Sequence, residues 1–474
     1  MKKKLLLENF LVYGLGQVVY KAIPLLLTPI ITRVMLDSQY CLGIHDLFTT
    51  FVTLVSIIGL LGMYDALFRL SFDYDENDLE IRQRICSTAF GITSMASSVL
   101  ALTVIVLRHT VSVFLFKDDK LGWLVVILAI TIVLFNMENI LLTPTRIDND
   151  RKIYILGNTA VAIVSYGVAL LFVLQGKCVI ALPIGNLLGL CIGCFFFGLV
   201  NKRYFSVNKF SVEWIKPLLK IGIPLFPTFL IFWVYASFDR LMISKYIDIE
   251  ANGIYSAANT LAKVSQLITT GFSAGWSFYT FSTMKDADHT KDFSKIVEYL
   301  LLAGVITFLP FRIFGEYILV LVFGVSYLAG GVAFSYLFFA PIVHLIFQIM
   351  GSQFLVIKKP IYTTVISILG VGLNIVLNYY WIQRYGIVGA AMATNLSYWV
   401  LIIVGSVFLY IHKLFIYSKK EIVLFVCYIV ILIQDLNGLV GSFIPYSAIL
   451  CIGVICLFYF KDFFIMLKGD LLRK

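Results

Sequence analysis

The chain alternates long apolar stretches with short polar segments. About fourteen of these stretches approach the roughly 20 residues that an α-helix needs to cross a hydrocarbon core about 30 Å thick. We predict spans at residues 9–32, 41–64, 85–107, 121–143, 153–174, 178–200, 218–238, 253–280, 294–311, 331–350, 360–381, 387–411, 421–435 and 443–460. The pattern therefore predicts an all-α polytopic membrane protein with about 14 transmembrane helices.

Composition supports this class. The 474 residues are 60% hydrophobic and only 14% charged, whereas soluble domains average roughly 45–50% apolar and 25% charged residues. So many spans leave only short connections, which excludes a nucleotide-binding domain, a long extracellular module and most enzymes. No catalytic residue is therefore predicted.

No motif in the chain indicates a cofactor or a metal. The GxxxxGK[ST] loop that binds nucleotide phosphates does not occur. Cys191 and Cys194 have CxxC spacing, but no second cysteine pair or histidine cluster accompanies them. We expect neither a cofactor nor a metal site.

The net charge of +10 is explained by membrane topology. Lys and Arg residues concentrate in alternate connecting segments, beginning with Lys2, Lys3 and Lys4. Positive charge near span ends is favoured on the cytoplasmic side, so both termini are predicted to be cytoplasmic. The basic excess does not indicate a nucleic-acid partner.

An internal repeat runs through the first twelve spans. Arg33 recurs as Arg240, and Gly43-Ile44 recurs as Gly253-Ile254, in both cases about 210 residues later. Equivalent elements are six spans apart, an even number, so the two copies point the same way through the membrane. Parallel repeats of this kind are related by an axis along the membrane normal.

The repeat defines the predicted domains. Residues 1–203 form an N-terminal six-helix lobe and residues 204–413 a C-terminal six-helix lobe, related by pseudo-symmetry around a central cavity. Residues 414–474 add two further C-terminal helices and a cytoplasmic tail.

Polar residues inside the spans indicate which helices line this cavity. Asp46 belongs to a polar face of the second span, and Lys263 belongs to the equivalent face of the eighth. We predict that the cavity is lined by Gln17, Lys21, Asp46, Asn259, Lys263 and Gln266.

Lys21 and Lys263 are the most informative of these positions. Each lies near the middle of its span, where a charge costs roughly 2.5–3.5 kcal/mol on insertion scales and faces a wet cavity or a partner. Two such cations beside one acid predict a site for an anionic group. The alternatives are that Lys21 pairs with Asp46, or that either lysine extends along its stem to the interface.

A second set of charges lies at the ends of the spans. These residues are candidates for gates that form and break ion pairs, or for contacts with phosphate: Arg33, Asp65, Arg69, Asp239 and Arg240. Ordinary interfacial ion pairs are the alternative explanation for each of them.

Motifs along the whole chain resemble one transporter family. The first half contains Gly14-Leu-Gly-Gln17, Pro24, Pro29, Thr32-Arg33 and Tyr40-Cys-Leu-Gly43-Ile44. The second half contains Lys220-Ile-Gly-Ile-Pro224, Phe238-Asp239-Arg240 and Gly253-Ile-Tyr255. Their combination and order resemble the polysaccharide flippases of the multidrug/oligosaccharidyl-lipid/polysaccharide (MOP) exporter superfamily.

The resemblance implies a carrier rather than an enzyme. Such a carrier moves undecaprenyl-diphosphate-linked oligosaccharide repeat units from the inner to the outer leaflet of the bacterial cytoplasmic membrane by alternating access, for O-antigen, capsule or exopolysaccharide assembly. Its implied partners are the lipid-linked glycan, membrane lipids, a polysaccharide polymerase and a chain-length regulator. Because this chain has few cations deep in the cavity, Arg33, Arg69 and Arg240 are the further candidates for diphosphate contacts.

Other functions are left open by the residues alone. A cation-coupled drug antiporter of the same superfamily would have twelve spans and a carboxylate-rich ion site, whereas Asp46 is the one well-placed acid here. A membrane polysaccharide polymerase or ligase usually needs a long external loop. A structural scaffold would not need lysines at the midplane.

Overall fold

The computed structural model describes residues 22–73, 78–437 and 444–471, and these residues form helices with no β-strand among them. Nine helices of this described part are long and apolar enough to cross a membrane. The all-α, multi-pass prediction is therefore confirmed, while the count of fourteen spans stays a prediction. Gln17 and Lys21 lie outside the described residues.

Contacts divide the chain into two compact units, Met1–Ala257 and Ala258–Lys474. The predicted lobe boundaries at residues 203 and 413 stay predictions. In the first unit the helices are α2 (Ser38–Leu60), α3 (Met63–Ser71), α4 (Leu79–Val106), α5 (Arg108–Phe116), α6 (Gly122–Ile147), α7 (Arg151–Leu174), α8 (Cys178–Val200), α9 (Ile215–Tyr246) and the start of α10 (Ile249–Thr283).

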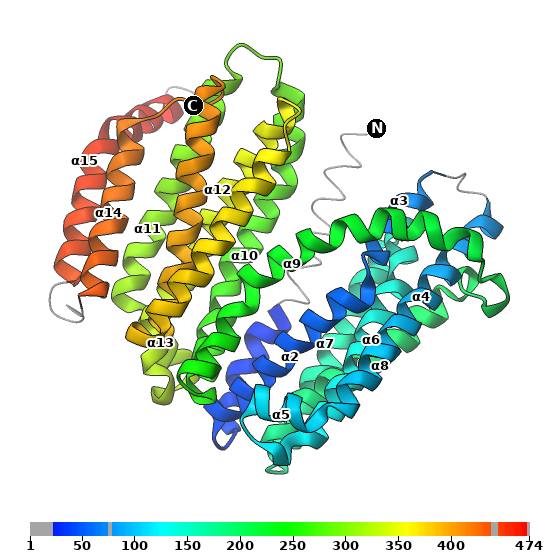
Figure 1. Ribbon diagram of the computed structural model, residues 1–474. Helices are drawn as coiled ribbons and strands as arrows, with labels where there is room; N and C mark the ends of the chain where they lie inside the picture. Colours follow the sequence, from blue (N-terminus) through cyan, green and yellow to red (C-terminus); the bar gives the residue numbers. More distant parts are fainter. Residues whose placement is uncertain (1–21, 74–77, 438–443, 472–474) are drawn as a thin grey trace. The chain divides into compact units, whose positions relative to one another are not determined.

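The first unit is a helical bundle in which α6 packs against both α4 and α8, and α7 packs against α8 (Figure 1). The long α9 crosses α2 and α3. The interior of the first unit is apolar. One cluster in it contains Phe48, Leu124, Leu128 and Ile132, all of which are almost fully buried. The side chains of this cluster hold α2 against α6, and so fix one wall of the site described below.

The second predicted span is broken into α2 and α3. Leu61 and Gly62 lie between them with φ angles of 48° and 68°, and this left-handed conformation is readily adopted by glycine. Gly62 also approaches the backbone of Gly222 in α9 so closely that a side chain at Gly62 would collide with it. The break therefore needs a glycine, and it turns α3 away from the direction of α2.

The second unit contains most of α10 and five further helices. They are α11 (His289–Phe323), α12 (Gly331–Val356), α13 (Ile361–Ile411), α14 (Lys419–Leu436) and α15 (Ile444–Leu471). Two differences from the predicted spans stand out. Helix α11 continues through Pro310, and α13 joins the predicted spans 360–381 and 387–411 across a kink at Gly386, where φ is 62° and ψ is −142°.

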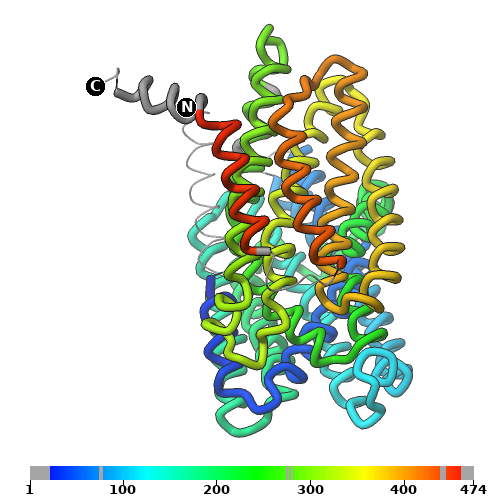
Figure 2. The backbone as a smooth tube through the Cα atoms, turned by 90° about the vertical axis from the view of Figure 1, so that its left-hand side faces the viewer, coloured from blue at the N-terminus to red at the C-terminus, as the bar shows by residue number. Residues whose placement is uncertain are grey.

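Helices α14 and α15 pack against each other and against α11 (Figure 2). A buried ion pair fixes α14 in this position. The Arg312 Nη2 atom of α11 lies 2.5 Å from Asp435 Oδ1 of α14, and the Tyr336 hydroxyl of α12 donates to Asp435 Oδ2 at 2.6 Å. The side chains of Arg312 and Asp435 are only 5% and 1% exposed, so water cannot replace either partner.

We expect Asp435→Ala to destabilise the second unit strongly. Removing one partner of a buried pair leaves an uncompensated charge, at a cost of about 3–5 kcal/mol. Thermal unfolding of the detergent-purified protein should show a clearly lowered Tm. The double variant Arg312→Leu/Asp435→Leu should recover most of the loss, because it removes both charges together.

The control is Glu80→Gln, which breaks the exposed ion pairs of Glu80 with Arg84 and Lys209, and each such pair is expected to contribute about 0–1 kcal/mol. Equal Tm values for Asp435→Ala and Glu80→Gln would contradict a structural role for the buried pair.

Candidate functional site

A buried polar cluster centred on Asp46 connects α2 to α9 and α10. The Arg240 Nε atom lies 3.1 Å from Asp46 Oδ2. Asn252 Nδ2 donates to the same oxygen at 3.2 Å, and the Ser256 hydroxyl donates to Asp46 Oδ1 at 3.0 Å. The carboxylate of Asp46 therefore has a cation and two neutral donors, which together offset the cost of burying it.

Asp239 and Arg240 are adjacent in sequence but their side chains have different partners. Asp239 Oδ2 accepts from the Tyr255 hydroxyl at 2.5 Å, and Asp239 Oδ1 accepts from the backbone N–H of Arg240 at 2.9 Å. Arg240 Nη1 donates to the Ser237 hydroxyl at 3.1 Å. The guanidinium of Arg240 therefore bridges α9 and α2, while Asp239 ties α9 to α10.

Two glycines allow α2 and α10 to meet at this cluster. A side chain on Gly43 would collide with the backbone oxygen of Ile249, and one on Gly253 would collide with the backbone oxygen of Gln39. Because neither glycine has a side chain, the two backbones can approach closely enough for their polar residues to bond.

The residues that meet here occupy equivalent positions in the predicted repeat. Gly253 lies 210 residues after Gly43, and Ser256 lies 210 residues after Asp46. Asp46 and Ser256 are hydrogen-bonded to each other.

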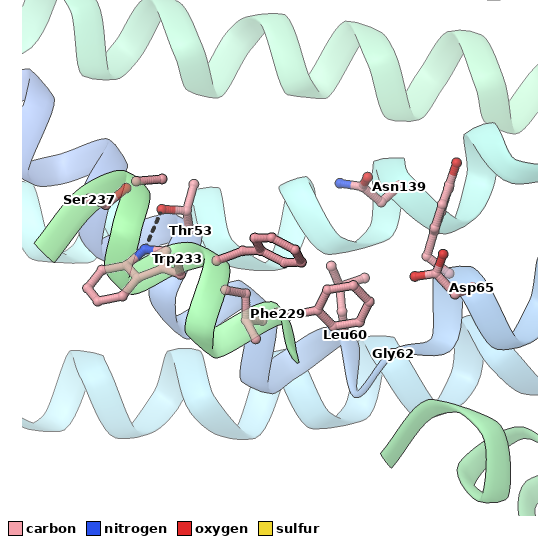
Figure 3. A pocket seen from close by; sticks show the side chains of 12 residues that line it. Thr53, Leu60, Gly62, Asp65, Asn139, Phe229, Trp233 and Ser237 are labelled. Atoms are coloured by element: carbon pink, nitrogen blue, oxygen red, sulfur yellow. Dashed lines mark hydrogen bonds between the residues drawn. The ribbon is translucent and has the colours of Figure 1, made fainter. Parts of the chain in front are cut away.

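A cavity of about 450 Å³ lies beside this cluster, among α2, α3, α6 and α9 (Figure 3). Trp233 and Thr53 both line it, and the Trp233 indole N–H donates to the Thr53 hydroxyl at 3.1 Å. Its other lining residues are mostly apolar or aromatic: Ile57, Leu60, Gly62, Tyr64, Asp65, Asn139, Phe229, Phe232, Ala236 and Ser237.

The two ends of the cavity differ in chemistry. Ser237, which binds Arg240, lies beside Trp233, whereas Asp65 lies toward the opposite end of the view in Figure 3. Phe229 lies between them in this view, and Phe232 also lines the cavity. The cavity therefore offers aromatic surface along its length, with polar groups concentrated at its ends.

The other predicted site residues are placed as follows. Lys263 and Gln266 are exposed on α10, and Asn259 is half-buried. Arg33 is exposed near the end of the helical segment Ala22–Val34. Since Lys263 and Gln266 are three residues apart on one helix, they lie on the same exposed polar face.

The charged residues predicted at the ends of the spans do not all lie at one site. Arg69 is exposed and forms its ion pair with Asp73, four residues on, rather than with Asp65. Asp65 lines the cavity instead. Arg240 forms its ion pair with a predicted cavity residue, Asp46.

Several residues of the site were missed from the sequence. Ser237 and Trp233 showed no periodic signal, because each lies within an apolar segment, and Asn252 falls in the polar stretch just before the predicted eighth span. The repeat offers one usable clue. Asn252 directly precedes the Gly253 motif, so it lies opposite Gly43, whose backbone oxygen it also contacts at 3.3 Å.

Comparisons with known proteins agree on family and fold. A family model described as polysaccharide biosynthesis protein matches residues 30–330. The probable flippase AglR of Haloferax volcanii is 26% identical over 227 residues, which are 44% of this chain and 47% of that protein. The match thus spans about half the length of this relative.

Two solved structures are similar in fold. The lipid II flippase MurJ, in an inward closed conformation, has a TM-score of 0.71 at 13% identity, with 96% of this chain and 100% of that chain covered. A multidrug resistance MATE family transporter of the MOP superfamily, in an inward-facing conformation, has a TM-score of 0.63 at 14% identity, with 83% and 95% covered.

The family model covers more than half of the chain, and the resemblance inferred from the sequence motifs is confirmed. The protein is a multi-pass membrane protein that belongs to the polysaccharide biosynthesis protein family and has the fold of the flippases and transporters of the MOP superfamily.

Proposed function

We propose that the protein moves undecaprenyl-diphosphate-linked oligosaccharide units from the inner to the outer leaflet of the bacterial cytoplasmic membrane. The product would feed assembly of a surface polysaccharide such as O-antigen, capsule or exopolysaccharide, with a polymerase and a chain-length regulator as partners. Both termini are cytoplasmic in this proposal. The family match and the flippase name of the relative support it.

The observation that carries the mechanism is the juxtaposition of the cavity and the buried Asp46–Arg240 pair. Ser237 belongs to both, because it lines the cavity and binds Arg240. In alternating access, this cluster is the closure at one end of the path, and it holds α2, α9 and α10 together while the substrate enters from the other end.

The chemistry of arginine explains how a substrate could release this closure. A guanidinium presents a planar fork of donors that suits phosphate oxygens as well as it suits a carboxylate. A diphosphate that reaches Ser237 competes with Asp46 for Arg240. In such an exchange the arginine stays paired, while Asp46 keeps the hydrogen bonds from Asn252 and Ser256.

The cavity wall suits the non-ionic part of such a substrate. Its volume of about 450 Å³ falls in the range of roughly 300–1,000 Å³ typical of small-ligand pockets. Phe229, Phe232 and Trp233 offer flat apolar surfaces on which sugar rings can lie, and Asn139 and Thr53 supply polar groups. The polyprenyl tail stays in the lipid.

Lys263 supplies a second cation on α10. The side chain of Lys263 is exposed on a helix that carries many polar residues, so an anionic headgroup can reach it. Together with Gln266 on the same face, it is suited to hold diphosphate during the crossing. For a cell that is negative inside, export of two uncompensated negative charges is favoured by about 4.6 kcal/mol per 100 mV.

The cation-coupled antiporter is a weaker alternative. It depended on Asp46 as a carboxylate that binds and releases a cation. In the structure Asp46 is already held by Arg240, Asn252 and Ser256, so a free cation would have to displace an arginine.

Lys263→Ala tests the role of the second cation. We expect it to lower the initial rate of outward movement by about tenfold, since a hydrogen bond to a charged group contributes roughly 1.5–3 kcal/mol. The measurement is the appearance of a lipid-linked oligosaccharide in the outer leaflet of proteoliposomes. Lys245→Ala, which removes an exposed lysine at the end of α9, is the matched control, and equal rates for both variants would argue against diphosphate binding at Lys263.

Asp46→Asn tests the closure. Loss of the carboxylate leaves Arg240 without its ion-pair partner, so the closed state should lose about 3–5 kcal/mol of stability. We expect a cysteine at Ala236, in an otherwise cysteine-free protein, to react severalfold faster with an impermeant thiol reagent added outside.

The exchange variant Asp46→Arg/Arg240→Asp should restore slow labelling of the cysteine at position 236. In this variant the ion pair forms again, with the acid on α9 and the arginine on α2. Asp73→Asn, which breaks only the exposed pair with Arg69, should have no effect. A labelling rate that Asp46→Asn does not change would show that the pair does not close the path.

A further inference from the structure

Arg146, in the last turn of α6, is held by aromatic rings. Its Cζ atom lies 5.4 Å from the ring centroid of Tyr64, 5.8 Å from that of Phe68 and 6.0 Å from that of Tyr154. These distances are within the range of cation–π contacts. The rings come from α3 and α7, so they fix the guanidinium between two helices that neighbour α6.

The nearest carboxylate in sequence is already used by other residues. Asp148, two residues after Arg146, lies 2.7 Å from Arg203 Nη2 and 3.6 Å from Arg82 Nη1. It also accepts from the Tyr204 hydroxyl at 2.7 Å. Burial and this hydrogen bond raise the pKa of Tyr204, so its hydroxyl keeps the proton that it donates to Asp148.

Other arginines at this end of the first unit have acidic partners. Arg69 contacts Asp73, and Arg84 lies 3.1 Å from Glu80. By contrast, Arg146 forms no ion pair with any carboxylate in the described part of the chain. The end of a helix favours a cation in its last turn, which explains how the charge is kept there without an acid.

Tyr64 connects Arg146 to the cavity. This tyrosine lines the cavity next to Asp65, and its hydroxyl oxygen is buried with no hydrogen-bond partner among the described residues. The guanidinium therefore contacts the cavity wall through the Tyr64 ring. The end of the cavity opposite Ser237 thus has a cation and an unused hydroxyl close together.

We propose that Arg146 recognises the phosphate of a lipid-anchored substrate at the Tyr64 end of the cavity, before translocation. This inference rests on the proposed function and names the residue that first binds the diphosphate. The rings cover the apolar faces of the guanidinium and hold its plane, which leaves the N–H edges for phosphate oxygens. The side chain is exposed, so a headgroup can reach it.

The same chemistry would also suit the headgroup of an ordinary anionic phospholipid, and the test separates these two sources. The full-length protein is placed in phosphatidylcholine nanodiscs and titrated with undecaprenyl diphosphate or with phosphatidylglycerol, with bound lipid measured by native mass spectrometry. Arg146→Gln should weaken undecaprenyl diphosphate binding by about tenfold. It should change phosphatidylglycerol binding by less than about twofold.

Three further variants make the test specific. Arg84→Gln is the matched control at the same end of the unit and should leave both affinities unchanged. Arg146→Lys keeps the charge but loses the planar fork, so it should recover only part of the binding. Phe68→Leu removes one ring and should weaken binding severalfold while the Tm stays that of the wild type.

The possible outcomes are distinct. Wild-type affinity for undecaprenyl diphosphate in Arg146→Gln would overturn the assignment, and equal losses for both lipids would show a general headgroup site instead. A wild-type protein that moves no lipid-linked oligosaccharide in proteoliposomes would overturn the proposed function. Normal transport by the wild type, combined with unchanged binding by Arg146→Gln, would overturn only the role of Arg146.

Discussion

The ion pair between Asp46 and Arg240 is the interaction on which the candidate site depends. A charge inside a membrane protein must have a partner, because neither lipid nor a packed interior solvates it. Here the partners come from α2 and α9, and Asn252 and Ser256 of α10 complete the hydrogen bonds of the carboxylate. One acid therefore determines how three helices meet, and the cavity lies directly beside their junction.

The same requirement explains the other polar contacts in the protein. Arg312 and Asp435 join α11 to α14 deep in the second unit. At the end of α6, Asp148 forms ion pairs with Arg82 and Arg203 and accepts a hydrogen bond from Tyr204. Each contact satisfies a buried or half-buried charge within the protein. Arg146 differs, since its neighbours are rings that orient the guanidinium without neutralising it.

The cavity combines two kinds of surface that a lipid-linked glycan would need. Aromatic side chains of α9 line its length, and polar groups lie at its ends. The sequence suggested a chamber dominated by midplane lysines. In the described part of the chain, the cavity wall is instead mainly apolar, and the cations nearest to it are Arg240, through Ser237, and Arg146, through Tyr64.

The sequence by itself determined the class, the approximate spans and the family, because these depend on local features. An apolar window of about 20 residues is a transmembrane-helix candidate on its length and composition alone, and the family motifs are short runs of neighbouring residues. Only the tertiary structure decided which charges pair. Asp239 is adjacent to Arg240 in sequence, yet Arg240 forms its ion pair with Asp46. Pairing across about 200 residues depends on helix rotation and on close approach at glycines, and neither can be inferred from the order of residues along one helix.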